Sequence, residues 1–284
     1  MELFEQAGEN WGKRLMFIDL LPEDLVRPHP SFLRDEAANQ LFHVITQGDC
    51  AHRWKSEDGR MMFAQSVDYK GWLWLSKELN AKDRTERIAA LCNKLVKDRL
   101  PGILSDPDTA EQFCSTYAAL CGVSYRAEMN MEAYTCASVR PVIGVPGQIR
   151  PAGSQDVPII AVFLAGFSED AYGHPVTTES QLPVAERLIA AGNLSLWLHG
   201  DTPVSMANIA HRSPRHARIN SVYTPGEHRK KGFASAIVGE LTSQILKEGL
   251  TAMLYADLSN PHANGVYRSL GYQERGKIAD IRIY

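Results

Sequence analysis

The sequence lacks several features that would place it quickly in a class. It has only five cysteines, an odd number, and no two of them form a Cys-x-x-Cys pair. We therefore expect reduced thiols in a cytoplasmic protein, with no disulfide framework and no metal site. No apolar run approaches the ~18 residues of a membrane-spanning helix, so no membrane contact is expected. The opening stretch, MELFEQAGENWGKR, lacks the basic-then-apolar order of a secretory signal.

The chain also lacks a strong charge of either sign. Its formal net charge is −3, with 30 Lys and Arg against 33 Asp and Glu, so a nucleic-acid partner is not expected. Hydrophobic residues make up 44% and charged residues 22%, which indicates a globular protein with a full core. A length of 284 residues fits one large or two ordinary domains. Three prolines and three glycines gather in residues 140–156, and this break predicts a boundary that separates domains 1–145 and 146–284.

Hydrophobic spacing predicts a mixed α/β (α+β) chain. In the first half, it predicts helices over residues 31–46, 85–99 and 108–120, and strands over 60–67, 71–76 and 124–134. In the second half, helices are expected over 157–167, 181–191, 231–248 and 264–270, and strands over 194–198, 204–211, 216–224, 252–258 and 278–284.

One internal similarity suggests a duplicated fold. Tyr117-Ala-Ala-Leu-Cys-Gly precedes a strand that ends at Tyr134, and Tyr267-Arg-Ser-Leu-Gly precedes a strand that ends at Tyr284. Both halves also place strands before a long helix. A chance match is the alternative interpretation.

The segment richest in chemical signals is Ile219–Ser235, INSVYTPGEHRKKGFAS. A strand ends near Thr224, and a helix is expected to begin close to Gly232. The first turn of a helix has N–H groups without intrahelical acceptors and carries partial positive charge, so it suits a phosphate. Glycine and Ala234 leave room for the backbone to approach a diphosphate. The alternative is a basic helix start on a solvated surface, and the motifs of a nucleoside-triphosphate loop or a dinucleotide fold are absent.

A second segment, Leu254–Tyr272, follows the next strand. Asn260 offers an amide at the end of that strand, and Tyr267 lies on the short helix that comes next. A tyrosine, with a pKa of about 10, is able to protonate a departing thiolate with a pKa of about 8.5. The plain alternatives are a helix cap for Asn260 and a half-buried aromatic for Tyr267.

Together these two segments resemble the GNAT superfamily of N-acetyltransferases. The pattern Q/R-x-x-G-x-G/A is met by Arg229, Gly232 and Ala234. The pattern N-x-x-A-x-x-Φ-Y-x-x-x-G-F/Y, where Φ is apolar, is met by Asn260, Ala263, Val266, Tyr267, Gly271 and Tyr272. The resemblance covers residues 155–284, and residues 1–145 resemble the degenerate half of tandem GNAT-like proteins. It implies two GNAT-like domains, each a mixed, mostly antiparallel sheet flanked by helices, with a V-shaped splay between two strands of the C-terminal one.

The resemblance also implies roles for individual residues. Acetyl-CoA would lie in the splay as cosubstrate, with its pantetheine arm along Val222, Tyr223 and Thr224. Its diphosphate would be held by the turn of Arg229, Lys230, Lys231, Gly232, Phe233, Ala234 and Ser235. Asn260 and Ala263 would also contact the cosubstrate, an N–H near Val222 would polarise the acetyl carbonyl, and Tyr267 would protonate the CoA thiolate.

The resulting expectation is an N-acetyltransferase that acts on a primary amine of a small molecule or peptide by direct attack on the thioester. A non-catalytic CoA-binding regulatory module and an aminoacyl-tRNA-dependent transferase are the alternatives. Candidate bases are Glu169, Asp170 and Glu179, although each also fits a solvated carboxylate. The basic segment His211–Arg218 is expected to be a solvated turn, with contact to an acidic acceptor or a 3′-phosphate as the alternative. The identity of the acceptor and a homodimeric state are left open.

Overall fold

The computed structural model describes residues 16–284, so the opening stretch tested above for a secretory signal lies outside the described residues. The chain forms two compact units. Of the described residues, the first comprises those up to Glu128 together with Ala279–Tyr284, and the second comprises Met129–Ile278. The division therefore lies earlier than the predicted boundary near residue 145, and the end of the chain returns to the first unit.

The first unit is built on a sheet with the strand order β1-β2-β3-β4-β5-β12. All neighbours pair antiparallel except β4 and β5, which are parallel. The strands are β1 (Phe17–Asp19), β2 (Cys50–Ser56), β3 (Met61–Ser66), β4 (Gly71–Leu75), β5 (Gly102–Ser105) and the end of β12 (Gln273–Ile283). The helices are α1 (Pro30–Asp35), α2 (Leu41–Ile45), α3 (Ala81–Leu95) and α4 (Pro107–Cys121), with 3₁₀ turns at Pro22–Leu25 and Glu36–Asn39.

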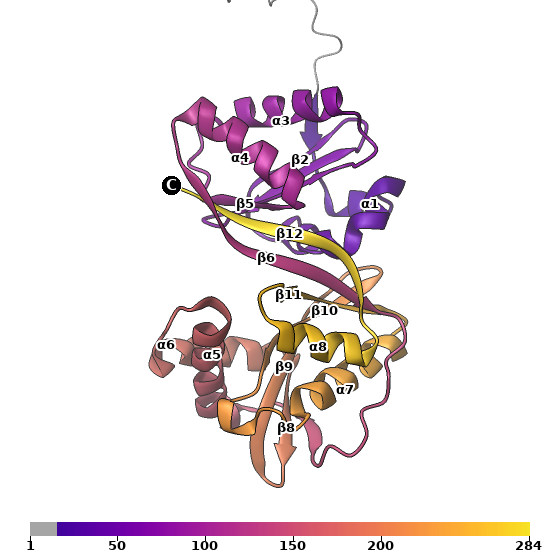
Figure 1. The fold of residues 1–284 in the computed structure, drawn as a ribbon, viewed down its shortest axis with the longest axis vertical. Helices are drawn as coiled ribbons and strands as arrows, with labels where there is room; N and C mark the ends of the chain where they lie inside the picture. The colour runs from indigo at the N-terminus through magenta and orange to yellow at the C-terminus, as the bar shows by residue number, and fades with distance from the viewer. Residues whose placement is uncertain (1–15) are drawn as a thin grey trace, which may run out of the picture. The chain divides into compact units, whose positions relative to one another are not determined.

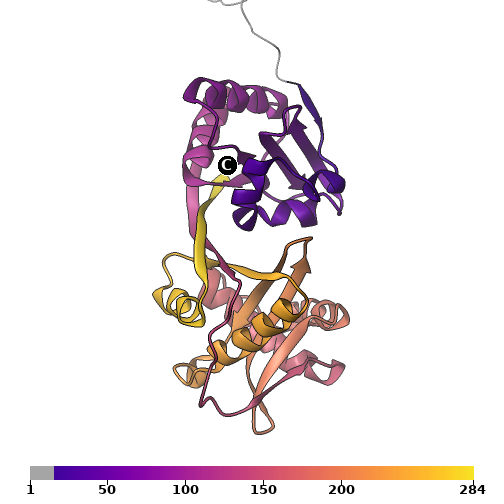
Figure 2. The ribbon, with the colours of Figure 1, turned by 90° about the vertical axis from the view of Figure 1, so that its right-hand side faces the viewer.

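Alternation along β4 sends its side chains to two cores, because successive residues of a strand face opposite sides. Leu73 and Leu75 join the cluster formed with α3 and α4, and these two helices lie side by side (Figures 1 and 2). Trp74 faces the other way, where its ring meets Phe32 of α1 edge-on at 5.2 Å. The predicted helix over 31–46 is broken into α1, a 3₁₀ turn and α2. Strands β1, β2 and β5 were not predicted.

The second unit has the strand order β6-β11-β10-β9-β8-β7. The strands are β6 (Tyr125–Cys136), β7 (Gln148–Pro151), β8 (Leu194–His199), β9 (Thr202–Arg212), β10 (His216–Tyr223) and β11 (Thr251–Asp257). The helices are α5 (Val157–Tyr172), α6 (Thr178–Ala190), α7 (Phe233–Lys247) and α8 (Pro261–Leu270), with 3₁₀ turns at Ser154–Asp156 and Gly226–His228. Nearly all of these elements match the sequence-based expectation; β7 was not predicted.

Two apolar clusters cover the two faces of this second sheet. One cluster joins α7 and α8 to inward residues of β9, β10 and β11, among them Ile209, Ile219 and Leu254. The other joins α5 and α6 to Leu196 and Met206. The helix pairs accordingly lie on opposite sides of the strands (Figure 1). The predicted mixed, mostly antiparallel sheet flanked by helices is confirmed.

The parallel pair β10–β11 is joined over a short stretch only. His216, Ala217 and Arg218 pair with Thr251, Ala252 and Met253, and the register does not continue beyond them. The remainder of β10 stays paired with β9 on its other side. The two strands therefore separate towards their carboxyl ends, which is the predicted V-shaped splay.

The two units repeat one order of elements, and they exchange their last strands. In each, three antiparallel strands lead into a helix, a parallel strand and a second helix: β2-β3-β4-α3-β5-α4 and β8-β9-β10-α7-β11-α8. The strand after α4 is β6, which pairs with β11 of the second unit. The strand after α8 is β12, which pairs with β5 of the first. This exchange places the division inside β6 and β12 rather than in the Pro/Gly-rich segment.

Candidate functional site

The carboxyl end of β10 carries a bulge beside the splay. Ser221 has a left-handed φ of 50°, and neither it nor Val222 has a partner in the register with β9, which resumes at Tyr223 opposite Met206. Val222 packs against the α7 and α8 core, whereas Tyr223 packs against the α5 and α6 core. A bulge of this kind re-aims backbone groups out of the ladder, so it turns N–H groups near Val222 away from β9.

The turn between β10 and α7 leaves a run of backbone N–H groups without acceptors. The first N–H of α7 that bonds back is that of Ala236, which donates to the Gly232 carbonyl at 2.9 Å. For the N–H groups of residues 230–235, no acceptor is found in the described part of the chain. Lys230 and Gly232 both have positive φ, 61° and 84°, which curls the N–H groups of the turn towards a common concavity. Unpartnered N–H groups at a helix start are the arrangement that the anion site expected from the sequence requires.

Gly232 is required here for a reason that the sequence did not reveal. A Cβ on Gly232 would come within 2.6 Å of the Val145 Cγ2 atom, and the φ of 84° is one that glycine adopts readily. The sequence-based reason, room for a diphosphate to approach the backbone, stays a prediction beside this one. The missing Cβ accommodates Val145, a residue of the Pro/Gly-rich segment, against the start of α7.

The basic side chains of the turn are only partly committed to protein partners. Arg229 forms an ion pair with Asp170 of α5 and donates from Nε to the Thr224 carbonyl at 3.0 Å. Lys231 donates to the Glu227 carbonyl at 3.0 Å, and Lys230 and Lys231 are both exposed. Among the expected bases, Asp170 is thus engaged by Arg229, and Glu169 and Glu179 are exposed on α5 and α6.

Some of the remaining residues of the turn and of the end of β10 have side chains in the core, and others lie near the surface. The Phe233 side chain is buried at 3% exposure in the core, so only its backbone faces the turn. Ala234 and Ser235 are half-buried on the first turn of α7. The Tyr223 and Thr224 side chains also have protein partners: Tyr223 lies against Gly166 of α5, and the Thr224 hydroxyl pairs with the Ser205 hydroxyl at 2.9 Å. These residues accordingly offer backbone groups more than side chains.

Asn260 lies after β11 and begins α8. Its Oδ1 atom accepts the Ala263 N–H at 3.0 Å, so the helix-cap interpretation of the sequence is observed directly. The Asn260 side chain is exposed, and its Nδ2 donors make no hydrogen bond within the described residues. Ala263 is half-buried and packs against the core.

Tyr267 lies on the face of α8 that meets the core. It is 8% exposed, and its ring lies 6.1 Å from that of Tyr134 and 6.0 Å from that of Tyr272, measured between centroids. Burial, with a smaller contribution from Tyr134, raises the pKa of Tyr267 to about 12. Its hydroxyl has no hydrogen-bond partner in residues 16–284, unlike that of Tyr134, which donates to Asn264 Oδ1 at 2.9 Å. The hydroxyl of Tyr267 is therefore protonated at neutral pH and uncommitted.

One polar group of the second unit, Arg218, lies in β10. The sequence placed it both in the strand predicted over 216–224 and at the end of the basic segment His211–Arg218, which was expected to be a solvated turn. The structure agrees with the strand, because β10 begins at His216. Within residues 16–284, the Arg218 Nε atom is buried and has no hydrogen-bond partner, and sequence reasoning missed this burial.

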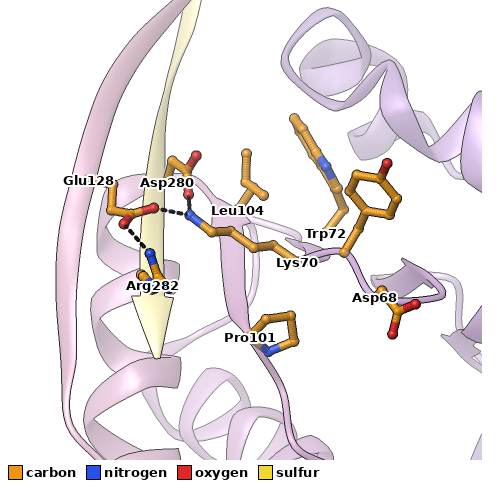
Figure 3. A pocket seen from close by; sticks show the side chains of 9 residues that line it. Asp68, Lys70, Trp72, Pro101, Leu104, Glu128, Asp280 and Arg282 are labelled. Carbon is orange, nitrogen blue, oxygen red and sulfur yellow. Dashed lines mark hydrogen bonds and ion pairs between the residues drawn. The ribbon is translucent and has the colours of Figure 1, made fainter. Parts of the chain in front are cut away.

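The first unit contains a cavity of about 420 Å³ beside β4, β5 and β12. Four of its five charged groups pair with one another, and Asp68 is the fifth: Lys70 bonds Glu128 at 2.7 Å and also pairs with Asp280, and Arg282 pairs with Glu128 (Figure 3). The hydrogen bond from Lys70 holds the pKa of Glu128 below its usual value against a smaller opposing effect of burial. A cluster with its charges already paired leaves little for a ligand, and none of the predicted site residues lies there.

Comparisons with known proteins agree with this geometry. Residues 197–281 match the model of the FR47-like protein family. Among solved structures, a GNAT-family acetyltransferase from Colwellia psychrerythraea is 13% identical, with a TM-score of 0.56, over 95% of this chain and 100% of its own. GCN5-related N-acetyltransferases from Sphaerobacter thermophilus (15% identity, TM-score 0.60, 96% and 97% covered) and Kribbella flavida (14%, 0.56, 88% and 94%) are also similar. No curated protein matches the sequence.

The solved structures cover nearly all of the chain, so the likeness extends to both units and not only to the motif-bearing one. At identities this low, the solved structures show similarity of fold alone. The family model covers β10, α7, β11 and α8. Within residues 16–284, no helix is long and apolar enough to cross a membrane. The resemblance expected from the two sequence motifs is thus confirmed: the fold is similar to that of GNAT acetyltransferases, and residues 197–281 match the FR47-like family model.

Proposed function

We propose that the protein transfers an acetyl group from acetyl-CoA to a primary amine of a small molecule or peptide. The observation that carries this proposal is the set of unpartnered N–H groups at residues 230–235, which open beside the β10–β11 splay. Fixed N–H donors at the start of a helix bind a diphosphate well, and two exposed lysines add positive charge there. The unpaired edge of β10 then offers backbone groups to the amides of a pantetheine arm.

In this proposal the acyl group lies near the bulge of β10. An N–H near Val222 donates to the thioester carbonyl and stabilises the oxyanion that forms when the amine attacks. One such donor lowers the barrier by roughly 3 kcal/mol. The Asn260 Nδ2 group is free to donate to the pantetheine, because only its Oδ1 atom is used as a helix cap.

Tyr267 is proposed to supply the proton for the departing sulfur. The C–S bond breaks as the amine nitrogen bonds the acetyl carbon, and the sulfur takes the phenolic proton. A pKa of about 12 keeps the hydroxyl protonated, and a thiolate that leaves in a desolvated cleft is itself more basic than in water. The amine must arrive neutral, so a base or a water chain removes its proton first.

The test is release of free CoA thiol from acetyl-CoA across a panel of amines, with acetyl-CoA binding measured separately by calorimetry. We expect thiol release that depends on the amine and follows sequential kinetics, because direct attack forms no acyl-enzyme. Thiol release without any amine would contradict direct attack. Tight binding without turnover on any amine would favour the regulatory module, and use of a charged tRNA in place of acetyl-CoA would favour the aminoacyl transferase.

A further inference from the structure

Among the described residues of the second unit, Arg218 is an arginine with a buried, unpartnered nitrogen and no carboxylate beside it. Arg150, Arg212 and Arg268 each pair with an acidic side chain at 2.6 to 2.8 Å. Arg218, by contrast, makes no ion pair within residues 16–284, and its Nε atom is buried without a hydrogen-bond acceptor. Its guanidinium carbon lies 5.7 Å from the ring centroid of Tyr255 on β11. An arginine remains charged in a protein, so an unpaired donor of this kind suits an anionic partner from outside the chain.

The position of Arg218 relates it to the splay. It is the last residue of β10 that pairs with β11, opposite Met253, so it marks the closed end of the V. A carrier whose diphosphate lies at the start of α7 would run back along residues 224–222, so its acyl end, at the bulge, would point towards Arg218. Ala217 and Ile219 face the α7 and α8 core, so the Arg218 side chain lies on the opposite face of the sheet, the face that α5 covers.

Burial destabilises the charged form of the Arg218 side chain when no anion is bound beside it. Desolvation lowers the pKa of Arg218, against smaller opposing effects from Tyr255 and Tyr172. The surrounding aromatic groups are therefore a poor substitute for a carboxylate. A carboxylate is the planar anion that matches a guanidinium with two parallel hydrogen bonds.

A second unpartnered atom lies on the same face. Asn208 of β9 is 4% exposed; its Nδ2 atom donates to Asn220 Oδ1 at 2.9 Å, and its own Oδ1 atom is buried without a donor. Asn220 is two residues beyond Arg218 on β10, and side chains two apart on a strand share a face. On this face, the Arg218 Nε donor and the Asn208 Oδ1 acceptor thus have no partner within the described residues.

We propose that the acyl acceptor is an amine that also carries a carboxylate, of the α-amino-acid type, and that Arg218 binds that carboxylate at the closed end of the splay. The proposal rests on the proposed function and narrows its acceptor class. Asn208 Oδ1 is placed to accept an N–H of the same molecule. Arg218 acts as a specificity-determining residue, because it holds the part of the acceptor that does not react.

The experiment compares amino acids with their amides as acceptors for the full-length protein and acetyl-CoA, using glycine with glycinamide and the corresponding pairs for larger side chains. We expect kcat/KM to favour the carboxylate member of the best pair by at least roughly 30-fold, since loss of one partner of a buried charge pair has an effect of that size. In Arg218→Met the ratio should fall to near one, mainly through a higher KM for the amino acid. Arg218→Lys should restore part of the preference.

Arg212→Met provides the matched control, because Arg212 lies on the neighbouring strand and is already paired with Glu248. It should leave the ratio unchanged. Turnover that is equal on both members of every pair, or a ratio that survives in Arg218→Met, would overturn this inference while leaving the acetyltransferase proposal in place. No turnover on any member, together with bound acetyl-CoA, would overturn the proposed function and this inference with it. A merely structural Arg218 would lower the melting temperature and weaken turnover on both members alike, without changing their ratio.

Discussion

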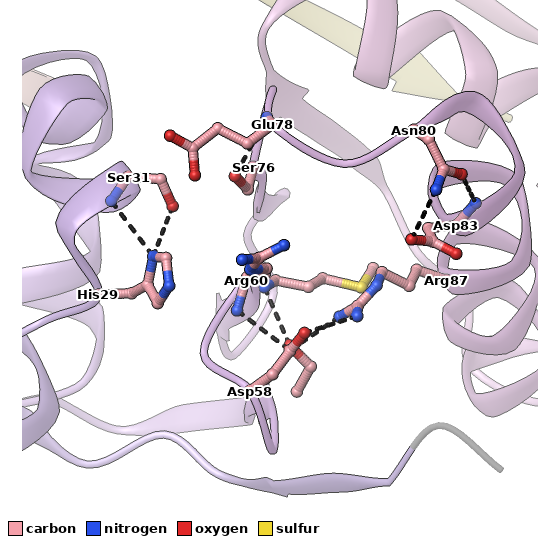
Figure 4. Close-up of polar contacts among 11 residues, drawn as sticks. His29, Ser31, Asp58, Arg60, Ser76, Glu78, Asn80, Asp83 and Arg87 are labelled. Carbon is pink, nitrogen blue, oxygen red and sulfur yellow. Dashed lines mark hydrogen bonds and ion pairs between the residues drawn. The ribbon is translucent and has the colours of Figure 1, made fainter. Parts of the chain in front are cut away.

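The starts of α3 and α7 occupy equivalent places in the two units, but they are capped differently. At α3, Asn80 Oδ1 accepts the Asp83 N–H at 2.9 Å, and Asp83 places a negative charge on the first turn (Figure 4). At α7, the N-cap is Gly232, which has no side chain, and the first turn has no acidic residue. A side-chain cap thus occupies the N–H donors of a helix start, and the lack of one at α7 leaves them available for the diphosphate that we propose there.

The parallel strand pairs of the two units also differ: the pair in the first unit is held together further along, and the pair in the second unit is not. In the first unit, β4 and β5 pair at Gly71 and Trp72, and further along the Ser105 hydroxyl donates to the Leu73 carbonyl at 2.7 Å. In the second unit, Ile219 and Leu254, the next residues along β10 and β11, fall outside the register. A side-chain bond thus ties the strands of the first unit together, where the second unit leaves an open edge.

The sharpest test of this comparison uses the paired tyrosines. Tyr117 on α4 donates to the Asp98 carbonyl at 2.5 Å, whereas Tyr267 on α8 donates to no described group. Tyr267→Phe should lower kcat about 100-fold with little change in acetyl-CoA affinity, because a general acid typically contributes that much. Tyr117→Phe should instead lower the free energy of unfolding by about 1 kcal/mol and leave kcat alone. Steady-state kinetics and urea unfolding of both variants check this, and equal kcat in Tyr267→Phe would assign the proton to solvent.

A second test introduces into α7 the acidic first-turn residue that α3 has. Ser235→Asp puts a carboxylate at the third position of α7, where α3 has Asp83. We expect acetyl-CoA affinity to fall roughly 30-fold, since the new carboxylate and a neighbouring diphosphate would repel each other by about 2 kcal/mol. The melting temperature should not fall, because an acidic side chain is favourable near a helix N-terminus. Calorimetry with acetyl-CoA measures the first effect and thermal unfolding the second.

Asp83→Ser is the reciprocal variant for that test. It should leave acetyl-CoA affinity unchanged, because α3 is not proposed to bind the carrier. If instead Ser235→Asp bound acetyl-CoA as tightly as the natural protein, the diphosphate would lie elsewhere than at the start of α7.

The smallest expected effect concerns how α3 is held to its sheet. Arg87 of α3 forms two hydrogen bonds with Asp58, at 2.9 and 2.7 Å (Figure 4). Burial by itself would raise the pKa of Asp58, but the bonds from Arg87, Ser56 and the Arg60 N–H outweigh it and hold the pKa below its usual value. The lowered pKa stabilises the fold above the unfolded-state pKa of about 3.9, and this contribution disappears as pH falls through the folded-state value.

Asp58→Asn should therefore lower the free energy of unfolding at pH 7 by only about 0.5 to 1 kcal/mol, because the Asp58 carboxylate is 44% exposed and solvent screens the pair. The gap between variant and natural protein should narrow as the pH is lowered below 4. Urea unfolding at pH 7 and pH 3 measures this gap. Arg87→Met should remove the same stabilisation, and combining it with Asp58→Asn should cause no further loss. A gap that widened in acid would contradict the sign of the pKa shift.

Most of the second unit could be predicted from the sequence, because its strands and helices carry clear periodicity and the turn signals fall where elements end. Helix α7 was expected over 231–248 and spans Phe233–Lys247. Strands β2 and β5 escaped prediction because His52, Arg53 and Lys55 obscure the apolar pattern of one, and the other has only four residues. Which strand partners which is a tertiary property, so the exchange of β6 and β12 left no local signal.

For the site, the sequence predicted the turn at residues 230–235 and the two residues of α8, Asn260 and Tyr267, because short motifs carry them. It missed the packing of Val145 against Gly232, since that contact joins distant segments. It also missed the isolation of Arg218, because the lack of a partner is visible only when every neighbour has been placed.

The exchange of last strands has a consequence for synthesis on the ribosome. The edge of β5 acquires its neighbour, Ala279–Arg282, only after the whole second unit has left the exit tunnel. The half that is translated first must therefore wait, with one side of its sheet uncovered, until residues 279–282 emerge. Removal of residues 279–284 would thus damage the first unit more than the second unit that precedes them in the sequence.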